Sequence, residues 1–544
     1  MKGTDWRALE RAVARLMSHC GWRDVAVIGR SGDKGADIVG IRDAAGSPRI
    51  WVVQVKAVLG GGYVGRTGLE EVMQAQSTYR AHVAALATNG DFTPIVHSRM
   101  NELNKAGFEA KLWNGSFLKD LLDKFPEKHH FERPLRPYQR DIATKAVSVY
   151  ESGGRKVQYV VATGLGKTVI AAEIASSLWN QGCRKILVLC HGMDLSLQLE
   201  QGFWPQLGKS VPTRYFYDGG PPLVYDGINF GLYQSLGGYL SGIEPGTFEV
   251  VIVDEAHRAL GHGFRQCIDH LAPRFLVGMT ATPWRGDGQS IDELFGEPIA
   301  RVSLVDGMAL GFLAQVDYRL YCDNINWDAI PDLSRERHSI RDLNKRLFLP
   351  QRDEAVISEI IKAASELANP RIAVFSPSKE HAERLAAMLS ARGISCESLS
   401  IRDKVERRKR LLAFSGGKLS AVTAVEVMNE GIDVPDVNLL VFLRATHSRR
   451  IFVQQLGRGL RLAHDKDKVV VLDFVSDLRR MAEVAELDKE ARIRGRRPES
   501  LFLRDGIVSF SDPAGQQFIE AWISDVADLS EVGDAEKLKF PEGL

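Results

Sequence analysis

The feature that most constrains the fold is a series of short apolar runs that alternate with helical segments from about Tyr159 onward. The runs cover residues 157–163, 185–191, 250–254, 275–280, 371–376, 437–443 and 469–474. Strands this rich in Val, Ile and Leu, with helices between them, are typical of parallel sheets covered on both faces. The pattern therefore predicts an α/β protein with two such sheets between residues 134 and 480.

Composition limits the partners of this chain. Of its 544 residues, 44% are apolar and 26% are charged, which excludes a wholly disordered chain. Lys and Arg number 70 against 69 Asp and Glu, so the net charge of +1 excludes a polybasic binder but not a local basic groove. Residues 1–120 hold 16 basic against 12 acidic residues, and residues 501–544 hold 3 against 9. We expect this acidic end to be a solvated tail, with partner docking as the alternative.

Signals for membranes and secretion are missing from the sequence. No stretch approaches the roughly 18 uninterrupted apolar residues of a spanning helix, and residues 1–10 lack the apolar core of a signal peptide. The six cysteines include no C-x-x-C spacing, which favours buried thiols over disulfides or a zinc site. We therefore expect a cytoplasmic protein without a membrane partner.

One apolar run leads into a glycine turn and then a helix, where residues 160–168 are Val-Val-Ala-Thr-Gly-Leu-Gly-Lys-Thr. Glycine lets the backbone wrap phosphate oxygens, and the N–H groups at a helix start face the anion. The lysine would reach the outer phosphates and the last threonine would hold Mg²⁺. The strict G-x-x-x-x-G-K-[ST] pattern is not met, because Val161 stands at its first glycine. The candidate ATP-binding residues are Thr163, Gly164, Gly166, Lys167 and Thr168.

A second apolar strand ends in two adjacent carboxylates, Asp254 and Glu255. Acids at the tip of a buried strand need partners. Mg²⁺ is the natural partner of Asp254, and Glu255 is then placed to polarise the attacking water, since phosphoryl transfer depends mainly on positioning and charge neutralisation. We assign the following His257 to the same nucleotide site; a plain pair of strand-end carboxylates is the alternative.

A third element, residues 454–461, carries Arg458 and Arg461. Two residues three apart on a helix lie on one face. Supplied from the second sheet, these two guanidinium groups could meet the γ-phosphate of ATP, although a solvated surface helix would show the same spacing.

Together these elements resemble the two RecA-like lobes of a superfamily 2 helicase or translocase of the DEAH type, over residues 134–480. The resemblance implies that Gln139, in the sequence Arg-Pro-Tyr-Gln, recognises adenine, and that Thr-Ala-Thr-Pro at 280–283 couples hydrolysis to lobe movement. It also implies nucleotide-binding roles for Gly431 and Asp433 and arginine-finger roles for Arg458 and Arg461. The amino-acid sequences of the motifs are most similar to those of restriction-enzyme motor subunits and DNA repair helicases. RNA is left open as a substrate.

The same resemblance implies contacts with one nucleic-acid strand near residues 191–193 and 233–235. Such contacts reach phosphates and carry little sequence information. A packing role for Tyr233 is the alternative.

The first 125 residues predict a second kind of site. They suggest helix, three strands, helix, strand, helix, strand, helix, and Glu10 lies within the apolar stripe of a helix over residues 5–19. Asp37 stands at a strand entrance, and strand alternation puts Gln54 and Lys56 on one face of a later, otherwise apolar strand. An ammonium beside a metal held by Asp37 and Glu10 explains this pattern better than packing does.

These residues resemble the PD-(D/E)xK nucleases, and within them the Mrr-like restriction endonuclease domain. The resemblance implies catalytic roles for Glu10, Asp37, Gln54 and Lys56, with Asp37 and Glu10 as metal ligands. Gln54 stands where the common pattern has an acid, which removes one negative charge and puts a second metal ion in doubt. A nuclease fold that only binds DNA is the alternative.

The expected organisation follows from these resemblances. We expect a nuclease domain over 1–126, helicase lobes over 134–312 and 351–480, a connector over 313–350, and a C-terminal extension over 481–544. The nuclease domain is expected to be joined flexibly near Pro126.

The predicted function is an ATP- and Mg²⁺-dependent DNA helicase or translocase coupled to a metal-dependent endonuclease, in restriction or anti-phage defence. Its expected partners are single- or double-stranded DNA and other restriction subunits. The alternatives are a DNA repair helicase whose first domain only grips DNA, and an ATP-gated nucleic-acid clamp that does not move along its substrate.

Overall fold

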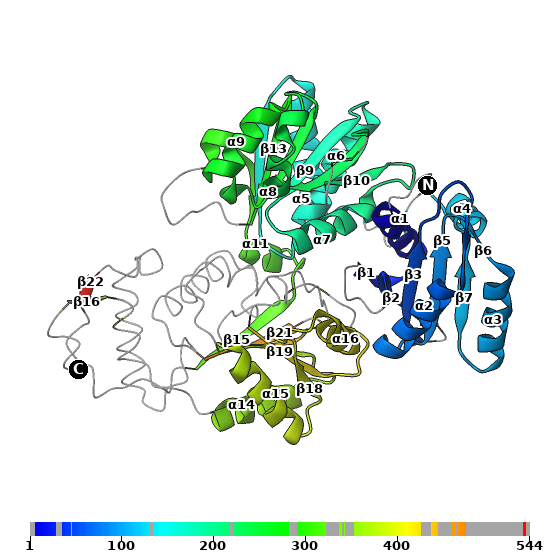
Figure 1. Ribbon diagram of the computed structural model, residues 1–544. Coiled ribbons are helices and arrows are strands. Elements are labelled where there is room, and N and C mark those ends of the chain that lie inside the picture. The colour runs from blue at the N-terminus through cyan, green and yellow to red at the C-terminus, as the bar shows by residue number, and fades with distance from the viewer. Residues whose placement is uncertain are drawn as a thin grey trace. The chain divides into compact units, whose positions relative to one another are not determined.

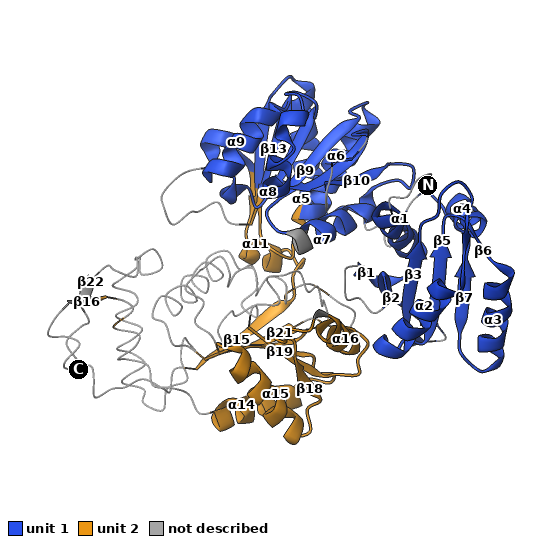
Figure 2. Ribbon diagram, viewed as in Figure 1, with its two compact units in different colours: residues 1–159, 168–279, 291–299 blue, residues 160–167, 280–290, 300–544 orange. Residues whose placement is uncertain are grey.

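The computed structural model divides the chain into two compact units, residues 1–159, 168–279 and 291–299, and residues 160–167, 280–290 and 300–544 (Figure 2). The residues that it describes are 6–28, 35–44, 46–127, 129–130, 134–216, 221–222, 224–281, 291–321, 337–339, 342, 353–425, 437–443, 460, 462, 466, 468–474 and 537–539.

The N-terminal domain is a five-stranded sheet with helices on its faces (Figure 1). Its strand order is β1-β2-β3-β5-β7, with β1, β2 and β3 antiparallel and β3, β5 and β7 parallel. The elements are α1 Trp6–His19, β1 Arg23–Val27, β2 Ile38–Ala44, β3 Ser47–Lys56, β4 Tyr63–Val64, α2 Arg66–Tyr79, β5 Val83–Thr88, β6 Asp91–Phe92, α3 Pro94–Lys105, β7 Ala110–Trp113 and α4 Gly115–Lys124. The expected element order is thus confirmed, with the two-residue strands β4 and β6 in addition.

The core of this domain forms between α1 and the sheet. Leu9, Val13 and Met17 of α1 share a buried cluster with Val53 and Val55 of β3. Since side chains alternate along a strand, Gln54 and Lys56 lie on the opposite face, where α2 packs. The expected stripe of α1 is confirmed except at its first residue, because Trp6 is exposed.

The first ATPase lobe is built on a seven-stranded sheet with the order β10-β11-β9-β12-β13-β8-β14. Neighbouring strands from β10 to β13 are parallel. The elements are α5 Pro137–Glu151, β8 Lys156–Val161, α6 Lys167–Asn180, β9 Lys185–Cys190, α7 Met193–Phe203, η1 Trp204–Gln206, β10 Thr213–Phe216, β11 Gly227–Leu232, α8 Tyr233–Gly237, η2 Leu240–Gly242, β12 Val250–Asp254, η3 Ala256–Arg258, α9 His262–Leu271, β13 Phe275–Thr280, α10 Asp292–Phe295, β14 Pro298–Val302 and α11 Leu304–Ala309.

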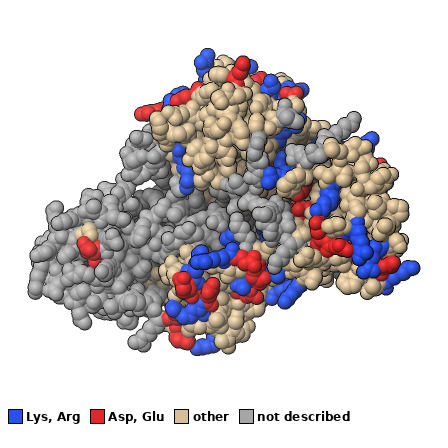
Figure 3. Space-filling model, viewed as in Figure 1, with Lys and Arg blue, Asp and Glu red and all other residues tan. Residues whose placement is uncertain are grey.

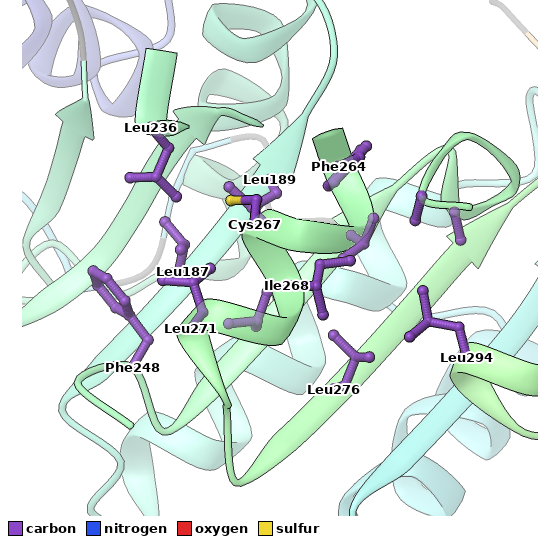
Figure 4. Close-up of a cluster of buried hydrophobic side chains, with 14 of the residues drawn as sticks. Leu187, Leu189, Leu236, Phe248, Phe264, Cys267, Ile268, Leu271, Leu276 and Leu294 are labelled. Carbon is purple, nitrogen blue, oxygen red and sulfur yellow. The ribbon is translucent and has the colours of Figure 1, made fainter. Parts of the chain in front are cut away.

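Helix α9 covers one face of this sheet. Its apolar side chains Phe264, Ile268 and Leu271 pack with Leu187 and Leu189 of β9 in a buried cluster (Figure 4). The strand β12 of this sheet ends in the acid Asp254. That end of the strand is where nucleotide residues were expected.

The second lobe is a six-stranded parallel sheet, ordered β15-β21-β20-β17-β19-β18. Its elements are β15 Gln315–Tyr321, α14 Asp353–Ser365, β17 Ile372–Phe375, α15 Lys379–Ala391, β18 Cys396–Ser398, α16 Lys404–Ser415, β19 Ala421–Ala424, β20 Leu439–Phe442 and β21 Lys468–Phe474. Strand β15 corrects one boundary, since residues 315–321 were expected in the connector. The strand is stabilised there by pairing with β21 along its whole length.

Other sequence expectations agree closely with the structure. Strands expected at 250–254 and 275–280 match β12 and β13, and the other five agree to within two residues at each end. Near the C-terminus, β22 Lys537–Lys539 pairs with β16 Arg337–Ser339, so this short part of the acidic end is paired with another strand.

Buried thiols were also expected. Among the described cysteines, Cys20, Cys183, Cys190, Cys267 and Cys396 are free and buried. No helix within the described ranges has both the length and the apolar character needed to cross a bilayer. On the face drawn in Figure 3, Lys and Arg side chains lie among Asp and Glu side chains.

Candidate functional site

The loop expected to bind phosphate is shaped by its two glycines. Strand β8 ends at Val161 and α6 begins at Lys167; between them Gly164 and Gly166 have φ of 86° and 85°. Only glycine adopts such angles without strain, so the tight turn depends on these residues. The Leu165 N–H donates to the Ala162 carbonyl at 3.2 Å and closes the turn.

A buried hydroxyl in this loop fits a bound anion. The Oγ1 atom of Thr163 is buried and has no hydrogen-bond partner among the described residues. Buried polar atoms in folded proteins are nearly always paired. A phosphate oxygen at the start of α6 would give this hydroxyl a partner.

The two acids at the end of β12 have different surroundings. Asp254 Oδ1 accepts a hydrogen bond from the Glu255 N–H at 2.9 Å. Glu255 has φ 50° and ψ 53°, in the left-handed region that an L-residue rarely occupies. Its Oε2 lies 3.3 Å from Nδ1 of His257, which is only 3% exposed. His257 therefore lies beside the carboxylate that is expected to activate water.

The negative charge of Asp254 also acts on a neighbour within the sheet. Burial raises the pKa of Tyr159 well above its usual value, and the nearby Asp254 carboxylate adds to that shift. The phenol is therefore neutral at any ordinary pH and donates to Sδ of Met279 at 3.3 Å.

Gln139, expected to recognise adenine, caps its own helix here. Its Oε1 accepts from the Arg136 N–H at 3.0 Å at the start of α5, and its side chain is 5% exposed. The amide N–H₂ lies 3.4 Å from the Tyr138 hydroxyl. The carboxamide is thus held in one orientation by the helix that carries it.

The two segments expected to touch a nucleic-acid strand lie next to each other. Nε2 of Gln234 donates to the His191 carbonyl at 3.4 Å. Tyr233, however, stacks on Phe264 with ring centroids 4.3 Å apart and 10° between the planes. The packing alternative for Tyr233 therefore has direct structural support.

The structure joins Asp37 to Gln54 in the N-terminal domain. Oδ2 of Asp37 accepts from Nε2 of Gln54 at 2.7 Å and from the Val55 N–H at 2.6 Å. Both side chains are buried, with 4% and 6% exposed. These bonds stabilise the ionised carboxylate and turn the Gln54 amide so that its nitrogen faces the acid.

Lys56 has a partner that the sequence did not reveal. Its Nζ pairs with Oε2 of Glu71 on α2. The approach of α2 to this region depends on Gly35, where a Cβ would lie 2.3 Å from the Glu71 carbonyl oxygen. The exposed fraction is 35% for both partners, so Lys56 remains accessible to a substrate. The sequence did contain a signal for this partner. It is a second acid beside Glu70, on a helix whose other face is apolar.

Glu10 lies on a helix that packs on the other face of the sheet. It is 2% exposed and lies on α1, which covers the face of Val53 and Val55. Asp37, Gln54 and Lys56 are therefore grouped by β2, β3 and α2, whereas Glu10 is supplied by a separate helix.

The donor set fits a metal ion only in part. Oε1 of Gln54 is buried and has no hydrogen-bond partner within the described ranges, as expected of an atom that could ligate a cation. Across the same residues, no group of three or more His, Cys, Asp or Glu side chains could hold a metal. An ion at this site would therefore have at most two acidic ligands, together with the neutral amide oxygen of Gln54 and water.

Some expected site residues lie outside the described residues. These are Gly431, Asp433, Arg458, Arg461 and the second half of the Thr-Ala-Thr-Pro motif.

Comparison with known families agrees with this division of the chain. A family model for the restriction endonuclease matches residues 1–122, one for the type III restriction enzyme res subunit matches 132–285, and one for the helicase conserved C-terminal domain matches 352–463. The chain therefore carries a restriction endonuclease domain in its N-terminal part, followed by domains of the res-subunit and helicase C-terminal families.

Its relatives include a restriction-enzyme subunit and a DNA translocase. The EcoAI endonuclease subunit of an Escherichia coli type I restriction enzyme is 26% identical over 62% of this chain and 46% of its own length. The DNA 3′-5′ translocase XPB2 of Sulfurisphaera tokodaii is 26% identical over 61% of this chain and 80% of its own length. The chain matches 51% of the length of the Saccharomyces cerevisiae relative IRC3, so it spans about half the length of IRC3 and of the EcoAI subunit.

A solved structure shares the fold over most of the chain. The ATP-dependent type ISP restriction-modification enzyme LlaBIII bound to DNA has a TM-score of 0.54, with 16% identity over 97% of this chain and 42% of that one. The likeness is one of fold.

Proposed function

We propose that this protein is an ATP- and Mg²⁺-dependent DNA translocase or helicase coupled to a metal-dependent DNA endonuclease. Its role is in restriction or anti-phage defence, alone or with other subunits, in the cytoplasm. Five buried free cysteines fit a reducing compartment. The relatives named for restriction and for DNA translocation support DNA as the substrate.

In the ATPase half, bound Mg²⁺–ATP supplies the phosphoanhydride bond whose hydrolysis drives movement. The N–H groups of the glycine turn and the Lys167 ammonium bind the phosphates, and Thr168 and Asp254 hold the cation. Glu255, positioned by His257 at 3.3 Å, orients the attacking water. By resemblance, Arg458 and Arg461 neutralise charge on the γ-phosphate.

In the nuclease half, a bound divalent cation supplies Lewis-acid chemistry at the scissile phosphate. Asp37, Glu10 and the Gln54 amide oxygen hold the cation, and Lys56 orients the attacking water. The observation that supports this half most directly is the Asp37–Gln54 hydrogen bond, which leaves Gln54 Oε1 buried with no hydrogen-bond partner among the described residues.

Nicking of supercoiled plasmid DNA tests both halves. We would compare the wild type with Lys56→Ala and Lys167→Ala, with and without ATP, and use Lys105→Ala on α3 as the matched control. Loss of nicking in Lys56→Ala, with normal ATP turnover, is expected. Unchanged nicking in that variant would disprove the nuclease assignment. Stimulation of ATP turnover by single-stranded RNA and not by DNA would disprove the choice of substrate.

A DNA repair helicase that only grips DNA with its first domain is the second candidate. The neutral Gln54 and the absence of a three-acid cluster in the described part of the chain favour it. In that case Lys56→Ala does not change nicking, while ATP-dependent displacement of a triplex-forming strand persists. Absence of triplex displacement would instead favour an ATP-gated clamp.

A further inference from the structure

Helix α1 of the nuclease domain is fixed to the first ATPase lobe by a buried arginine. Both domains belong to one compact unit (Figure 2). Nη1 of Arg15 donates to the Val211 carbonyl at 2.8 Å, and Nη2 donates to the Gly208 carbonyl at 2.9 Å. Burial lowers the pKa of Arg15 to about 10, and the negative charge of Glu200 opposes that shift. The guanidinium therefore stays charged at neutral pH and holds two backbone carbonyls of the loop between η1 and β10.

A second contact uses a buried acid from helix α7. Oε2 of Glu200 lies 3.5 Å from Nε of Arg11 on α1, and the Glu200 side chain is only 2% exposed. The other oxygen of Glu200 accepts from Oγ1 of Thr213 at 2.8 Å. Because a buried carboxylate needs such partners, Glu200 and Arg11 keep α7 and α1 in one relative position.

The loop that follows η1 also fixes the segment after the nuclease domain. Nζ of Lys209 donates to the carbonyls of Leu122 at 2.9 Å and Phe125 at 2.6 Å, at the C-terminal end of α4. Oγ of Ser210 donates to Oε1 of Glu127 at 2.9 Å. The flexible joint expected near Pro126 is thus wrong, because polar contacts hold the chain on both sides of that proline.

An aromatic side chain extends the same contact into the nuclease core. Trp204 of η1 is 2% exposed and belongs to the buried cluster that contains Leu9, Val13 and Trp113. A residue of the ATPase lobe therefore completes the hydrophobic core of the nuclease domain.

Helix α7 contacts the nucleotide site as well. A Cβ at Gly202 would lie 2.7 Å from Cγ2 of Thr168, the second residue of α6 and the expected Mg²⁺ ligand. At its other end α7 begins at Gly192, beside the segment expected to touch nucleic acid. Helix α7 is thus in contact with the ATP site through Gly202 and with the helix carrying Glu10 through Glu200.

We propose that α7 and the loop of residues 204–212 relay the nucleotide state of the first ATPase lobe to the nuclease site. Glu200, Arg11 and Arg15 act as positioning residues for α1, which supplies Glu10 to the candidate metal site. The proposal rests on the proposed ATPase and nuclease functions. Its physical reason is that close-packed, hydrogen-bonded helices do not deform continuously, so a shift at Thr168 moves α7 and α1 together.

Charge reversal in the full-length chain tests this relay. We would measure the nicking rate with ATP divided by the rate without it, and the DNA-stimulated ATPase rate, in Arg11→Glu, Glu200→Arg and the double variant. Arg99→Glu, on α3, makes the same charge change away from this contact. Each single reversal is expected to lower the ATP dependence of nicking by about 10-fold, within the coupling range of contacting residues, and the double variant to restore most of it.

A ratio that stays at the wild-type value in folded single variants would overturn the relay. The relay would also be overturned if the double variant did not restore the ATP dependence of nicking. A fall of the ATPase and nicking rates in equal proportion would overturn it as well. Failure of the wild type to nick DNA would instead refute the proposed nuclease function. The relay can then still be tested by a measurement that does not depend on nicking.

Hydrogen exchange on the wild-type chain supplies that second test. A non-hydrolysable ATP analogue with Mg²⁺ is expected to slow exchange of α1 amides as well as those of α6 and α7, and to leave α3 unchanged. Protection of α6 alone would overturn the proposal. The same experiment on Arg15→Lys is expected to reduce the protection of α1, because a lysine cannot donate to both carbonyls with a planar fork.

Discussion

The two candidate sites are built in different ways. The ATP site is formed largely by backbone conformation, with Gly164 and Gly166 in the left-handed region and Glu255 strained at the end of β12. The nuclease site is formed by side chains from β2, β3, α2 and α1, joined by the Asp37–Gln54 bond and the Lys56–Glu71 pair. A site made from one continuous segment is fixed by local sequence, whereas a site made from four elements depends on how the domain packs.

The largest expected effect is a loss of ATP hydrolysis at the ATP site. Glu255→Gln removes the group that orients water and leaves the glycine turn intact. We expect DNA-stimulated phosphate release to fall by about 10²–10⁴-fold, the range for a lost general base, with ATP analogue binding retained. Glu244→Gln, an exposed change of the same kind, is the control. A rate within a few fold of wild type would show that Glu255 does not activate the water.

The next effect is on the nuclease side. Asp37→Asn replaces the charged acceptor of two hydrogen bonds with a neutral amide, whose oxygen is a weaker acceptor. We expect nicking to fall by about 10²-fold or more and the folded state to lose about 1–3 kcal/mol, with ATP turnover unchanged. Plasmid nicking and urea unfolding measure these effects. Unchanged nicking by Asp37→Asn would show that cleavage does not depend on the hydrogen bonds of Asp37.

Two glycine variants test how strongly the packing of α2 constrains the nuclease site. Gly35 and Gly46 have φ of 85° and 79°, but a Cβ at Gly35 would lie 2.3 Å from a backbone oxygen, whereas a Cβ at Gly46 would meet nothing within 4 Å. Alanine at Gly46 should cost about 1 kcal/mol for its conformation alone. Alanine at Gly35 should cost about 1–3 kcal/mol more, because α2 must move. Equal losses in urea unfolding would show that α2 does not constrain the site.

The smallest expected effect concerns pH. His19 and His129 have ring centroids 4.4 Å apart, and burial lowers their pKa values to about 3 and about 4. The unfolded chain therefore binds protons at these residues first as pH falls below about 6.5. Stability should be full above that pH and decrease steadily towards pH 4. His129→Gln should flatten the change in unfolding midpoint between pH 7 and pH 5; an unchanged slope would exclude this histidine as the cause.

Much of the fold was predictable from the sequence because the signals were local. Apolar runs predicted β8, β9, β12 and β13 of the seven-stranded sheet and β17, β20 and β21 of the six-stranded sheet. A glycine turn between a strand and a helix predicted the phosphate loop. Strand β15 was not predictable in this way, since its place in the second sheet depends on pairing with β21, about 150 residues later in the chain. Glu71 was missed for the same reason: its pairing with Lys56 is set by the packing of α2 on β3.

The sequence by itself determined the elements, the order of the domains and the residues able to do chemistry. Those properties follow from hydrophobic period, glycine conformation and the chemistry of short segments, all of which act over a few residues. Only the tertiary structure decided that Trp204 completes the nuclease core and that Arg15 and Glu200 fix α1 to the ATPase lobe. Such contacts join residues nearly 200 positions apart. Their partners are therefore selected by burial and pairing in the folded chain and not by a local sequence pattern.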